Sequence, residues 1–279
     1  MEQYTTVITS ISIPLDLKLR EVWRYRDLML LFVRRTFVSQ YKQTILGPAW
    51  AVIQPLLTTV VFTIVFGNLA GLAPGGVPTF VFYLSGSILW TYFSNCLTAT
   101  STTFTTNAAI LGKVYFPRLV MPISTVLSQL ISFAIQFAFF LLFWSYFLLR
   151  GDDLHPNIWI LMTPILLLHL AALSLGVGII ISSLTTKYRD LAMAVGFCVQ
   201  LWMYATPVAY DVAIIPERMM NLYMLNPVTP IITMMRYAYL GIGELHLRYY
   251  GVSTSITLCV LLVGTVLFNR VEKTFMDTV

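Results

Sequence analysis

The sequence feature that most constrains this chain is a stretch of about seventy residues, 43–112, that contains no Asp, Glu, Lys or Arg. A basic, aromatic-rich segment precedes it, and the boundary lies in RRTFVSQYKQTILGPAWAVIQP, residues 34–55. Such an abrupt end of charge beside a long apolar run is typical of a membrane boundary. Only 10% of all residues are charged and 58% are hydrophobic, whereas an average soluble domain has about 25% charged residues. Lipid must therefore cover much of the surface, which predicts an all-α integral membrane protein.

Six stretches are apolar and close to the roughly 20 residues that a helix needs to cross the hydrocarbon core. They span residues 49–69, 78–98, 120–149, 158–184, 191–210 and 252–269. Helices are the expected spanning form, because backbone groups inside a bilayer must be hydrogen-bonded within the protein. The third and fourth stretches exceed the required length, which predicts tilt or protrusion beyond the bilayer.

The segment 221–240 is also apolar, but it is not predicted to span. Pro227 and Pro230 break it and Arg236 interrupts the remainder; a proline inside a helix costs about 3 kcal/mol. We expect one or two short helices here, between the fifth and sixth spans, that re-enter the membrane from its outer face. A seventh span would also move the C-terminal cations outside, against the distribution of the others.

The Lys and Arg residues set the expected orientation. Thirteen of the seventeen fall on one side of the six spans, and seven of these precede the first span. The remaining four are Arg150, Arg218, Arg236 and Arg248. Both termini are therefore expected in the cytoplasm. We attribute the net charge of +5 to topology and contact with anionic lipids, and expect no nucleic-acid partner.

The spans contain almost no ionisable side chains. His169 is the single titratable group well inside a span apart from thiols and tyrosines, and we interpret it as a hydrogen-bond donor between packed helices. Pumps and secondary transporters use ionisable groups at membrane depth to carry protons or ions. An ion-coupled carrier or an autonomous channel is therefore disfavoured, and the energy for any transport is expected to come from outside this chain.

No motif for catalysis or cofactor binding is present in the sequence. Gly112-Lys113 lacks the upstream glycine and the following Ser or Thr of a phosphate-binding loop. Paired catalytic carboxylates, His/Cys clusters and a nucleophile elbow are missing. Asp152 and Asp153 are adjacent, but they follow Gly151 in a short loop, where solvation explains them. We expect no catalytic, cofactor or metal site, and the chain is not expected to be an enzyme.

Residues 20–42 are predicted to form a helix, since they contain no Gly or Pro. Arg34, Arg35 and Lys42 cluster broadly toward one face with other charged residues. Apolar residues at helical spacing lie elsewhere, at Trp23, Leu30, Val33, Phe37 and Tyr41. We expect this helix to lie in the inner interface with its cations toward lipid head groups. The alternative is an ordinary positive flank that only sets orientation.

Two cytoplasmic loops are candidates for docking to a soluble partner. The second loop, 99–122, ends in a compact apolar and basic block, and the fourth loop, 185–190, has the sequence TTKYRD. Aromatic residues and arginine are favoured at interface hot spots. Simple positive-inside anchoring is the alternative for these loops.

Aromatic residues are frequent within the spans, and three explanations remain open. They would form belts at the membrane interfaces, fill lipid-facing positions, or line a path for carbohydrate, whose C–H faces stack on rings. The candidates for such a path are Phe62, Phe66, Tyr83, Trp90, Tyr92, Trp202 and Tyr204.

Three blocks of residues resemble the permease subunits of ABC-2-type polysaccharide exporters, the O-antigen, capsule and teichoic-acid export family of the Wzm type. They are YKQTILGPAW at 41–50 with Pro55, KVYFPR at 113–118 with Pro122, and Asn226-Pro227 in the last outer loop. The hydropathy layout is similar to that family over residues 20–279. The domains expected are an N-terminal tail at 1–19, an interfacial amphipathic helix at 20–48, an ABC-2-type transmembrane domain at 49–270 and a cytoplasmic tail at 271–279.

The resemblance implies a homodimer in the bacterial inner membrane that works with two copies of a separate cytoplasmic ATPase. ATP and Mg²⁺ would be bound by that partner and not by this chain. The residues that would couple to the ATPase are Lys113, Val114, Tyr115, Phe116, Pro117, Arg118, Lys187, Tyr188 and Arg189. The cations that would attract the pyrophosphate of a polyprenyl carrier are Arg34, Arg35 and Lys42. The outer gate would comprise Asn226, Pro227, Pro230 and Arg236.

The function expected from the residues and the resemblance together is export of a lipid-linked polysaccharide, powered by the separate ATPase. One rival is an ABC-2 exporter of a small hydrophobic drug or lipid. A second is a membrane enzyme of glycan synthesis, such as a glycosyltransferase, and the missing carboxylate chemistry argues against it.

Overall fold

The computed structural model describes residues 19–42, 44–111, 113–114, 116–185, 188 and 190–274, and these form helices joined by loops, without β-strands. The all-α prediction is therefore confirmed for the described part of the chain. The α-helices are α1 Leu19–Arg24, α2 Arg26–Tyr41, α3 Trp50–Phe62, α4 Thr79–Ser101, α5 Thr103–Thr106, α6 Ala108–Leu111, α7 Val120–Arg150, α8 Thr163–Thr185, α9 Leu191–Tyr204, α10 Glu217–Tyr223, α11 Thr229–Leu240 and α12 Leu247–Thr274. Gly47–Ala49, Ile158–Met162 and Val212–Ile214 form 3-10 turns, and Thr63–Leu69 is π-helical.

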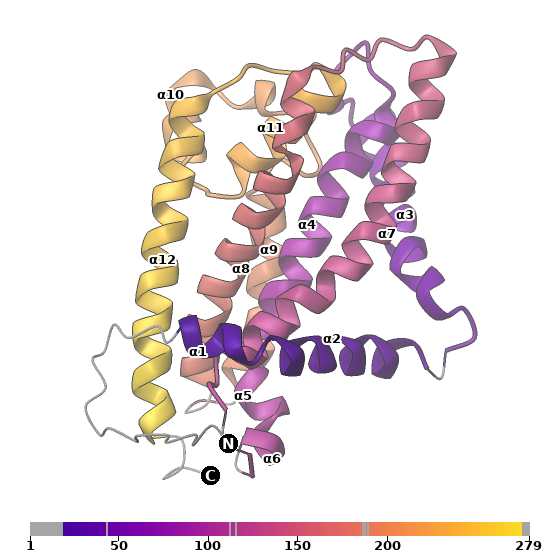
Figure 1. The fold of residues 1–279 in the computed structure, drawn as a ribbon. Helices are drawn as coiled ribbons and strands as arrows, with labels where there is room; N and C mark the ends of the chain where they lie inside the picture. The colour runs from indigo at the N-terminus through magenta and orange to yellow at the C-terminus, as the bar shows by residue number, and fades with distance from the viewer. Residues whose placement is uncertain are drawn as a thin grey trace.

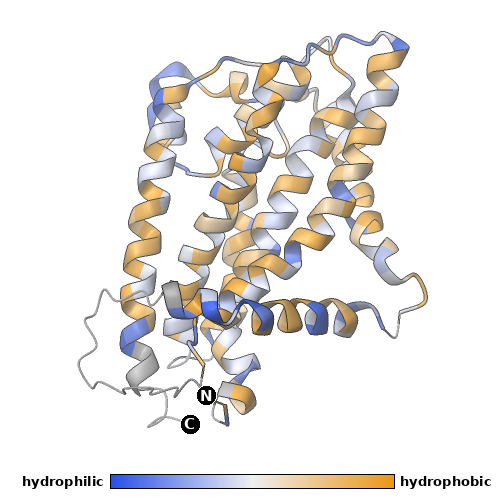
Figure 2. Ribbon diagram, viewed as in Figure 1, coloured by the Kyte–Doolittle hydropathy of each residue, from blue (hydrophilic) through white to orange (hydrophobic). Residues whose placement is uncertain are grey.

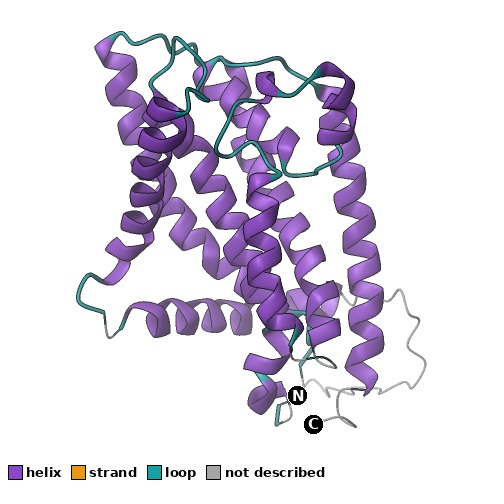
Figure 3. Ribbon diagram, turned by 180° about the vertical axis from the view of Figure 1, so that it is seen from behind, coloured by secondary structure: helices purple, strands orange, loops and turns teal. Residues whose placement is uncertain are grey.

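The long helices form a bundle whose two ends differ (Figure 1). One end carries α1, α2, α5 and α6, and we call it the inner end. The opposite, outer end carries α10 and α11 together with the loops that follow α7 and precede α4. Seen from behind, the loops again gather at the two ends (Figure 3). The chain therefore alternates in direction as the order of predicted spans requires.

Four helical segments of the described chain are long and apolar enough to cross a membrane: Gly47–Leu69, Val120–Arg150, Ile158–Thr185 and Leu247–Arg270. They correspond to four of the six expected spans. Figure 2 shows hydrophobic residues along these helices and hydrophilic ones at the outer tip of α12 and on α2. The chain is thus an integral membrane protein.

Helix α4 corresponds to the second expected span, but its environment is protein. It packs against α3, α7, α8 and α9, and residues 81–90 are all buried. Its buried residues include the polar Ser85, Ser87 and Thr100. Hydroxyls on a central helix can bond to backbone carbonyls, as Ser85 does to Phe82 at 2.7 Å. A helix surrounded by protein therefore needs less apolar surface than one that faces lipid.

Helix α9 is shorter than the 191–210 stretch expected from hydropathy, because it ends at Tyr204. Pro207 follows closely, and the residue before a proline is disfavoured in helical geometry. The segment 205–210 instead turns back toward α11. Arg236 of α11 donates hydrogen bonds to its carbonyl oxygens at Val208 and Tyr210. Hydropathy alone does not distinguish this buried turn from the end of a helix.

The sharp change of direction between α2 and α3 comes from Leu46-Gly47-Pro48. Helix α2 lies across the inner end of the bundle (Figure 1), and its contacts are mainly with α7. Gly47 has a φ of 52°, a left-handed conformation that favours glycine. Pro48 occupies the first turn of the next helical segment, where its missing N–H costs nothing. A lying helix thus turns directly into the first apolar span.

Helices α8 and α12 pack closely through small residues and one polar cluster. A Cβ added to Gly264 would lie 2.8 Å from the carbonyl oxygen of Gly176, so only glycine allows this approach. The imidazole Nε2 of His169 lies 2.8 Å from the hydroxyl of Thr257 and 3.3 Å from that of Ser253. The interpretation of His169 as a hydrogen-bonding residue between packed helices is confirmed.

Candidate functional site

At the inner end, the expected coupling block 113–118 divides into an exposed tip and a buried anchor. Lys113 and Val114 are exposed, whereas the side chain of Phe116 is only 4% exposed. Pro117 and Arg118 are half-buried. The tip is therefore available to a partner, and the block is fixed to the bundle through Phe116.

Phe116 belongs to an apolar group that we call the inner cluster, which joins the inner ends of several helices. Its ring lies 5.8 Å from that of Phe32 on α2, between centroids. Phe104 of α5 stacks on Phe268 of α12 at 4.6 Å. The remaining buried members are Val22, Met29, Leu119, Val120, Met121 and Ile179. A displacement of the block would therefore be transmitted to α2, α8 and α12.

Two short helices, α5 and α6, stand where the sequence indicated a Ser- and Thr-rich loop. They extend below α2 at the inner end (Figure 1). Threonine and asparagine side chains bond to carbonyls one turn back, as Asn107 Nδ2 does to Thr103 at 3.1 Å. In the fourth loop Tyr188 is exposed. Tyr115, Lys187 and Arg189 lie outside the described residues.

The lying helix presents its cations to the surroundings. Arg34, Arg35 and Lys42 are all exposed, as head-group binding requires. The phenol of Tyr41 lies 3.2 Å from the hydroxyl of Ser132 on α7, which ties the end of α2 to the bundle.

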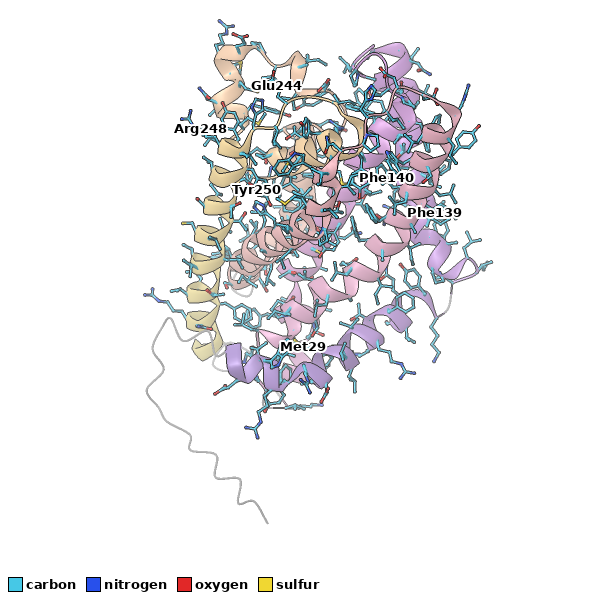
Figure 4. All side chains as sticks on the ribbon, turned by 45° about the horizontal axis from the view of Figure 1, so that its top comes forward. Met29, Phe139, Phe140, Glu244, Arg248 and Tyr250 are labelled. Atoms are coloured by element: carbon cyan, nitrogen blue, oxygen red, sulfur yellow. The ribbon has the colours of Figure 1, made fainter. Side chains whose placement is uncertain are left out.

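The apolar side of this segment differs from the expectation. Trp23 is 67% exposed and Leu30 is also exposed, whereas Val22, Met29 and Phe32 are buried. Figure 4 labels Met29 on this helix. The helical register continues through the bend at Tyr25, since Met29 bonds to the carbonyl of Tyr25 and the buried Val22 and Met29 are seven positions apart. Residues 28–33 are all apolar, so hydropathy did not distinguish the face that packs on the bundle from the neighbouring one.

The seven candidate channel aromatics are mostly packed within the chain. Phe62, Tyr83, Trp90 and Tyr92 are buried, Phe66 and Trp202 are half-buried, and Tyr204 is exposed. Six of the seven contact other aromatic rings: Phe62 contacts Phe66 and Tyr83, Tyr92 contacts Phe133, and Trp90 and Trp202 contact Phe93. A channel role for these rings stays a prediction.

At the outer end, Asn226 joins the end of α9 to the start of α11. Its Nδ2 donates to the carbonyl of Ala205 at 3.0 Å and to the hydroxyl of Thr206 at 2.8 Å. Its Oδ1 accepts from the indole N–H of Trp202 at 3.0 Å and from the backbone N–H of Val228 at 3.2 Å. A predicted gate residue and a predicted channel aromatic are thus brought into direct contact.

The two prolines of the predicted gate have different roles. Pro227 lies between α10 and α11, and its carbonyl accepts from the hydroxyl of Ser253 at 2.6 Å. Pro230 is in the first turn of α11, a position that proline favours. It therefore begins a helix, where the sequence pattern indicated an interruption.

Arg236 is the most buried cation among the described residues, at 2% exposure. Its guanidinium donates from Nη2 to the carbonyl of Val208 at 3.0 Å and from Nη1 to that of Tyr210 at 3.2 Å. Its Cζ lies 3.7 Å from the centroid of the Phe82 ring on α4, a cation–π contact. Arg236 thus holds α11, α4 and the turn after α9 together.

Burial lowers the pKa of Arg236 to about 10, and the nearby carboxylate of Asp211 opposes this shift. The guanidinium therefore keeps its charge at neutral pH. Burial also raises the pKa of Tyr223, whose hydroxyl donates to that of Tyr210 at 2.9 Å.

Sequence reasoning missed Gly86, which makes room for this arginine. A Cβ at Gly86 would lie 2.9 Å from Nη2 of Arg236 and 3.3 Å from the carbonyl oxygen of Val208. A glycine inside an apolar helix was the available signal, since it marks either helix packing or close approach of another group. The group that approaches Gly86 comes from α11, far along the chain, and the sequence does not indicate it.

Comparison with known proteins places these observations in a family. Residues 27–240 match the family described as ABC-2 type transporter. The chain is similar to two proteins from Klebsiella pneumoniae named O-antigen export system permease protein RfbA, with 26% and 25% identity over 253 residues, which cover 90% of this chain and 94% of each relative. It is also 26% identical to a Myxococcus xanthus protein of the same name, over 77% of this chain and 80% of that protein.

Proposed function

This chain belongs to the ABC-2 type transporter family, and we propose that it is the permease subunit of an exporter that moves a lipid-linked polysaccharide across the bacterial cytoplasmic membrane. The observation that carries the proposal is the nearly full-length correspondence with permeases named for O-antigen export. The glycan would be of the O-antigen, capsule or teichoic-acid type.

The energy for export would come from a separate ATPase that binds ATP and Mg²⁺. Two observations support this division of labour. The spans contain almost no ionisable side chains that could carry an ion. The exposed tip Lys113–Val114 and helices α5 and α6 project at the inner end, where a soluble partner would reach them. The inner cluster would pass its movement to the bundle.

The proposed topology has six spans and both termini in the cytoplasm. Helices α4 and α9 would complete the four spans identified by length and composition, and the excess of cations at the inner end supports the orientation. Helices α10 and α11 would re-enter the membrane from the outer face and form the gate around Asn226, Pro227, Pro230 and Arg236. Helix α11 is mostly buried within the bundle, whereas α10 has no buried residue and lies at the outer surface.

Two copies of the chain would pair, and two ATPase copies would bind below them. Arg34, Arg35 and Lys42 would meet the pyrophosphate of a polyprenyl carrier at the inner leaflet. Aromatic side chains at the surface between the two copies would contact the sugar chain.

Deletion of the gene in its own host tests the proposal. Surface polysaccharide should disappear while polyprenyl-linked glycan accumulates inside the cell, and a plasmid copy should restore export. Normal surface polysaccharide would refute the proposal. Loss of the internal glycan as well would point to an enzyme of glycan synthesis, and sensitivity to hydrophobic compounds with normal glycan would point to a drug or lipid exporter.

The coupling role has a separate test. Lys113→Glu should weaken co-purification of the ATPase and slow export, because it reverses charge at the exposed tip. Arg150→Glu, an exposed cation at the outer end, is the matched control and should have no effect. Equal ATPase recovery with both variants would remove Lys113 from the coupling surface.

A further inference from the structure

The outer end contains a cavity of about 350 Å³ between α10, α11 and the loop that precedes α12. Figure 4 labels Glu244, one of its lining residues, at this end of the molecule. The other residues that the argument uses are Asp211, Ala213, Thr233, Arg236 and His246. Its volume is in the range of about 300–1,000 Å³ that is typical of small-molecule sites.

The polar groups of the cavity have capacity for a ligand. Arg236 lines it, and the buried Nε of this arginine has no hydrogen-bond partner among the described residues. The Asp211 carboxylate accepts only a long bond, 3.4 Å, from the N–H of Ala213. Glu244 and His246 form a loose pair at 4.0 Å, and the glutamate side chain is 86% exposed. Unused donors and acceptors beside a cavity favour a hydrogen-bonding ligand.

The balance of charge narrows the class of that ligand. Two carboxylates and one guanidinium line the cavity together with one imidazole, so a highly charged ligand of either sign would meet a like charge. Carboxylates accept hydrogen bonds from hydroxyl groups, and an imidazole can accept or donate one. The wall between these groups is apolar, with Val212, Met220, Met224 and Ile242. A neutral ring with many hydroxyls and exposed C–H faces fits both features.

We propose that this outer cavity binds one saccharide unit and, resting on the proposed function, that the unit belongs to the glycan leaving the outer end. The gate residue Arg236 forms the inner wall of the site, so a bound sugar would contact the same arginine that ties the turn after α9 to α11. The site would bind one sugar ring of the emerging glycan at a time.

Binding of free sugars to the full chain in lipid nanodiscs tests this proposal. The probes are D-glucose, D-galactose, D-mannose, L-rhamnose and N-acetyl-D-glucosamine, each followed by saturation-transfer NMR. At least one should bind saturably, and Asp211→Asn with Glu244→Gln should weaken it roughly tenfold or more, because two charged acceptors are lost. Glu217→Gln is the matched control, since Glu217 is exposed on α10 and does not line the cavity.

A second variant fills the cavity and keeps its charges. Ala213 is exposed and lines the site, so Ala213→Trp should block binding while the protein remains monodisperse. The proposal is overturned if none of the five sugars binds above empty nanodiscs, or if binding survives both the double variant and Ala213→Trp. Failure of the export function would appear differently, as normal surface polysaccharide after gene deletion.

Discussion

The two ends of the molecule are held together by different forces. At the inner end, aromatic and aliphatic side chains pack around Phe116 and Phe32. At the outer end, Asn226 and Arg236 bind backbone and side-chain groups of the turn after α9. Apolar packing has no preferred direction, whereas a buried hydrogen-bond network specifies one geometry and is costly when partly broken.

This difference suits a permease that is driven from one side. Under the proposed function, movement of the ATPase would reach several helices through the inner cluster. Opening of the proposed outer gate would break the hydrogen bonds of Asn226 and Arg236. We therefore expect mutations to act on stability mainly at the outer network and on coupling mainly at the inner end.

The largest expected effect on stability comes from removing Arg236, the cation of the outer network. Arg236→Met should lower the free energy of unfolding by about 3–5 kcal/mol, because the carbonyls of Val208 and Tyr210 lose charged donors while they remain buried. Denaturant titration of the full chain in detergent measures the change. Arg218→Met on exposed α10 is the control, expected within about 0.5 kcal/mol of wild type. Equal stability of the two variants would contradict the role of Arg236 in joining α11 to α4 and to the turn after α9.

The second prediction concerns the inner end, where Phe116→Ala removes a buried aromatic ring from the inner cluster. Phe116→Ala should cost about 3 kcal/mol, because a buried phenylalanine leaves a cavity, and it should also loosen the ATPase. Phe116→Leu should retain most of the stability, since packing tolerates a change of shape. The exposed neighbour Val114 provides the control as Val114→Ala. If the leucine variant were as unstable as the alanine variant, the inner cluster would depend on specific geometry after all.

Substitution of Asn226 should change the free energy of unfolding less, but its bond to Trp202 can be tested by a double variant. Asn226→Ala should lower the free energy of unfolding by about 2–3 kcal/mol through its lost hydrogen bonds. Trp202→Phe removes one of those bonds from the other side. The double variant should be less destabilised than the sum of the two by at least about 0.5 kcal/mol, because they share the bond between the indole N–H and Oδ1. Strict additivity would mean that this bond contributes nothing.

Two glycine-to-alanine changes should have opposite signs. Gly86→Ala should destabilise by about 1–3 kcal/mol, since its Cβ would crowd Arg236. Gly196→Ala, in α9 with open space around it, should stabilise by up to about 1 kcal/mol through helix propensity. Thermal unfolding of both variants in one detergent checks the pair, and the same sign for both would reject the crowding argument.

The smallest effect concerns lipid contact at the inner end. Arg34→Gln and Arg35→Gln should each weaken binding of farnesyl pyrophosphate, a soluble probe of the carrier head group, by about fivefold, since one cation near a membrane contributes about 1 kcal/mol. The free energy of unfolding should not change, because both side chains are exposed. Arg248→Gln at the outer end is the control. Unaltered probe affinity in both inner variants would mean that the cations of α2 only set the orientation of the protein and do not bind the head group.

The fold was largely predictable where the sequence signal is local. The apolar stretches at 120–149 and 158–184 became α7 and α8, and the turn at Gly47-Pro48 separates the lying helix from the first span. Positions that depend on neighbours were not predictable from a local pattern. Residues 28–33 are all apolar, so the pattern did not show which face of this segment meets the bundle, and Trp23 is exposed. Helix α9 ends at Tyr204, and the turn that follows it accepts hydrogen bonds from Arg236 on α11.

The candidate site divides in the same way. Asn226, Pro227 and Arg236 were identified from their unusual place in an apolar segment and from the resemblance, and they meet at the outer end. Gly86 and Asp211 were missed because their significance comes from Arg236, which lies on a different segment. The candidate aromatics were chosen by type, and the structure packs most of them between helices of one protomer.

The sequence by itself determined that this chain is a helical membrane protein, that most of its Lys and Arg residues lie in alternate segments between the apolar stretches, and that it has no recognisable catalytic motif. These properties follow from hydropathy, charge and motif spacing, which are read along the chain. Only the tertiary structure decided that α4 is enclosed by protein, that Phe116 anchors an exposed tip, and that Arg236 holds a turn and lines a cavity. The physical reason is that a buried charge is stable only with suitable partners, and those partners come from residues far apart in the sequence.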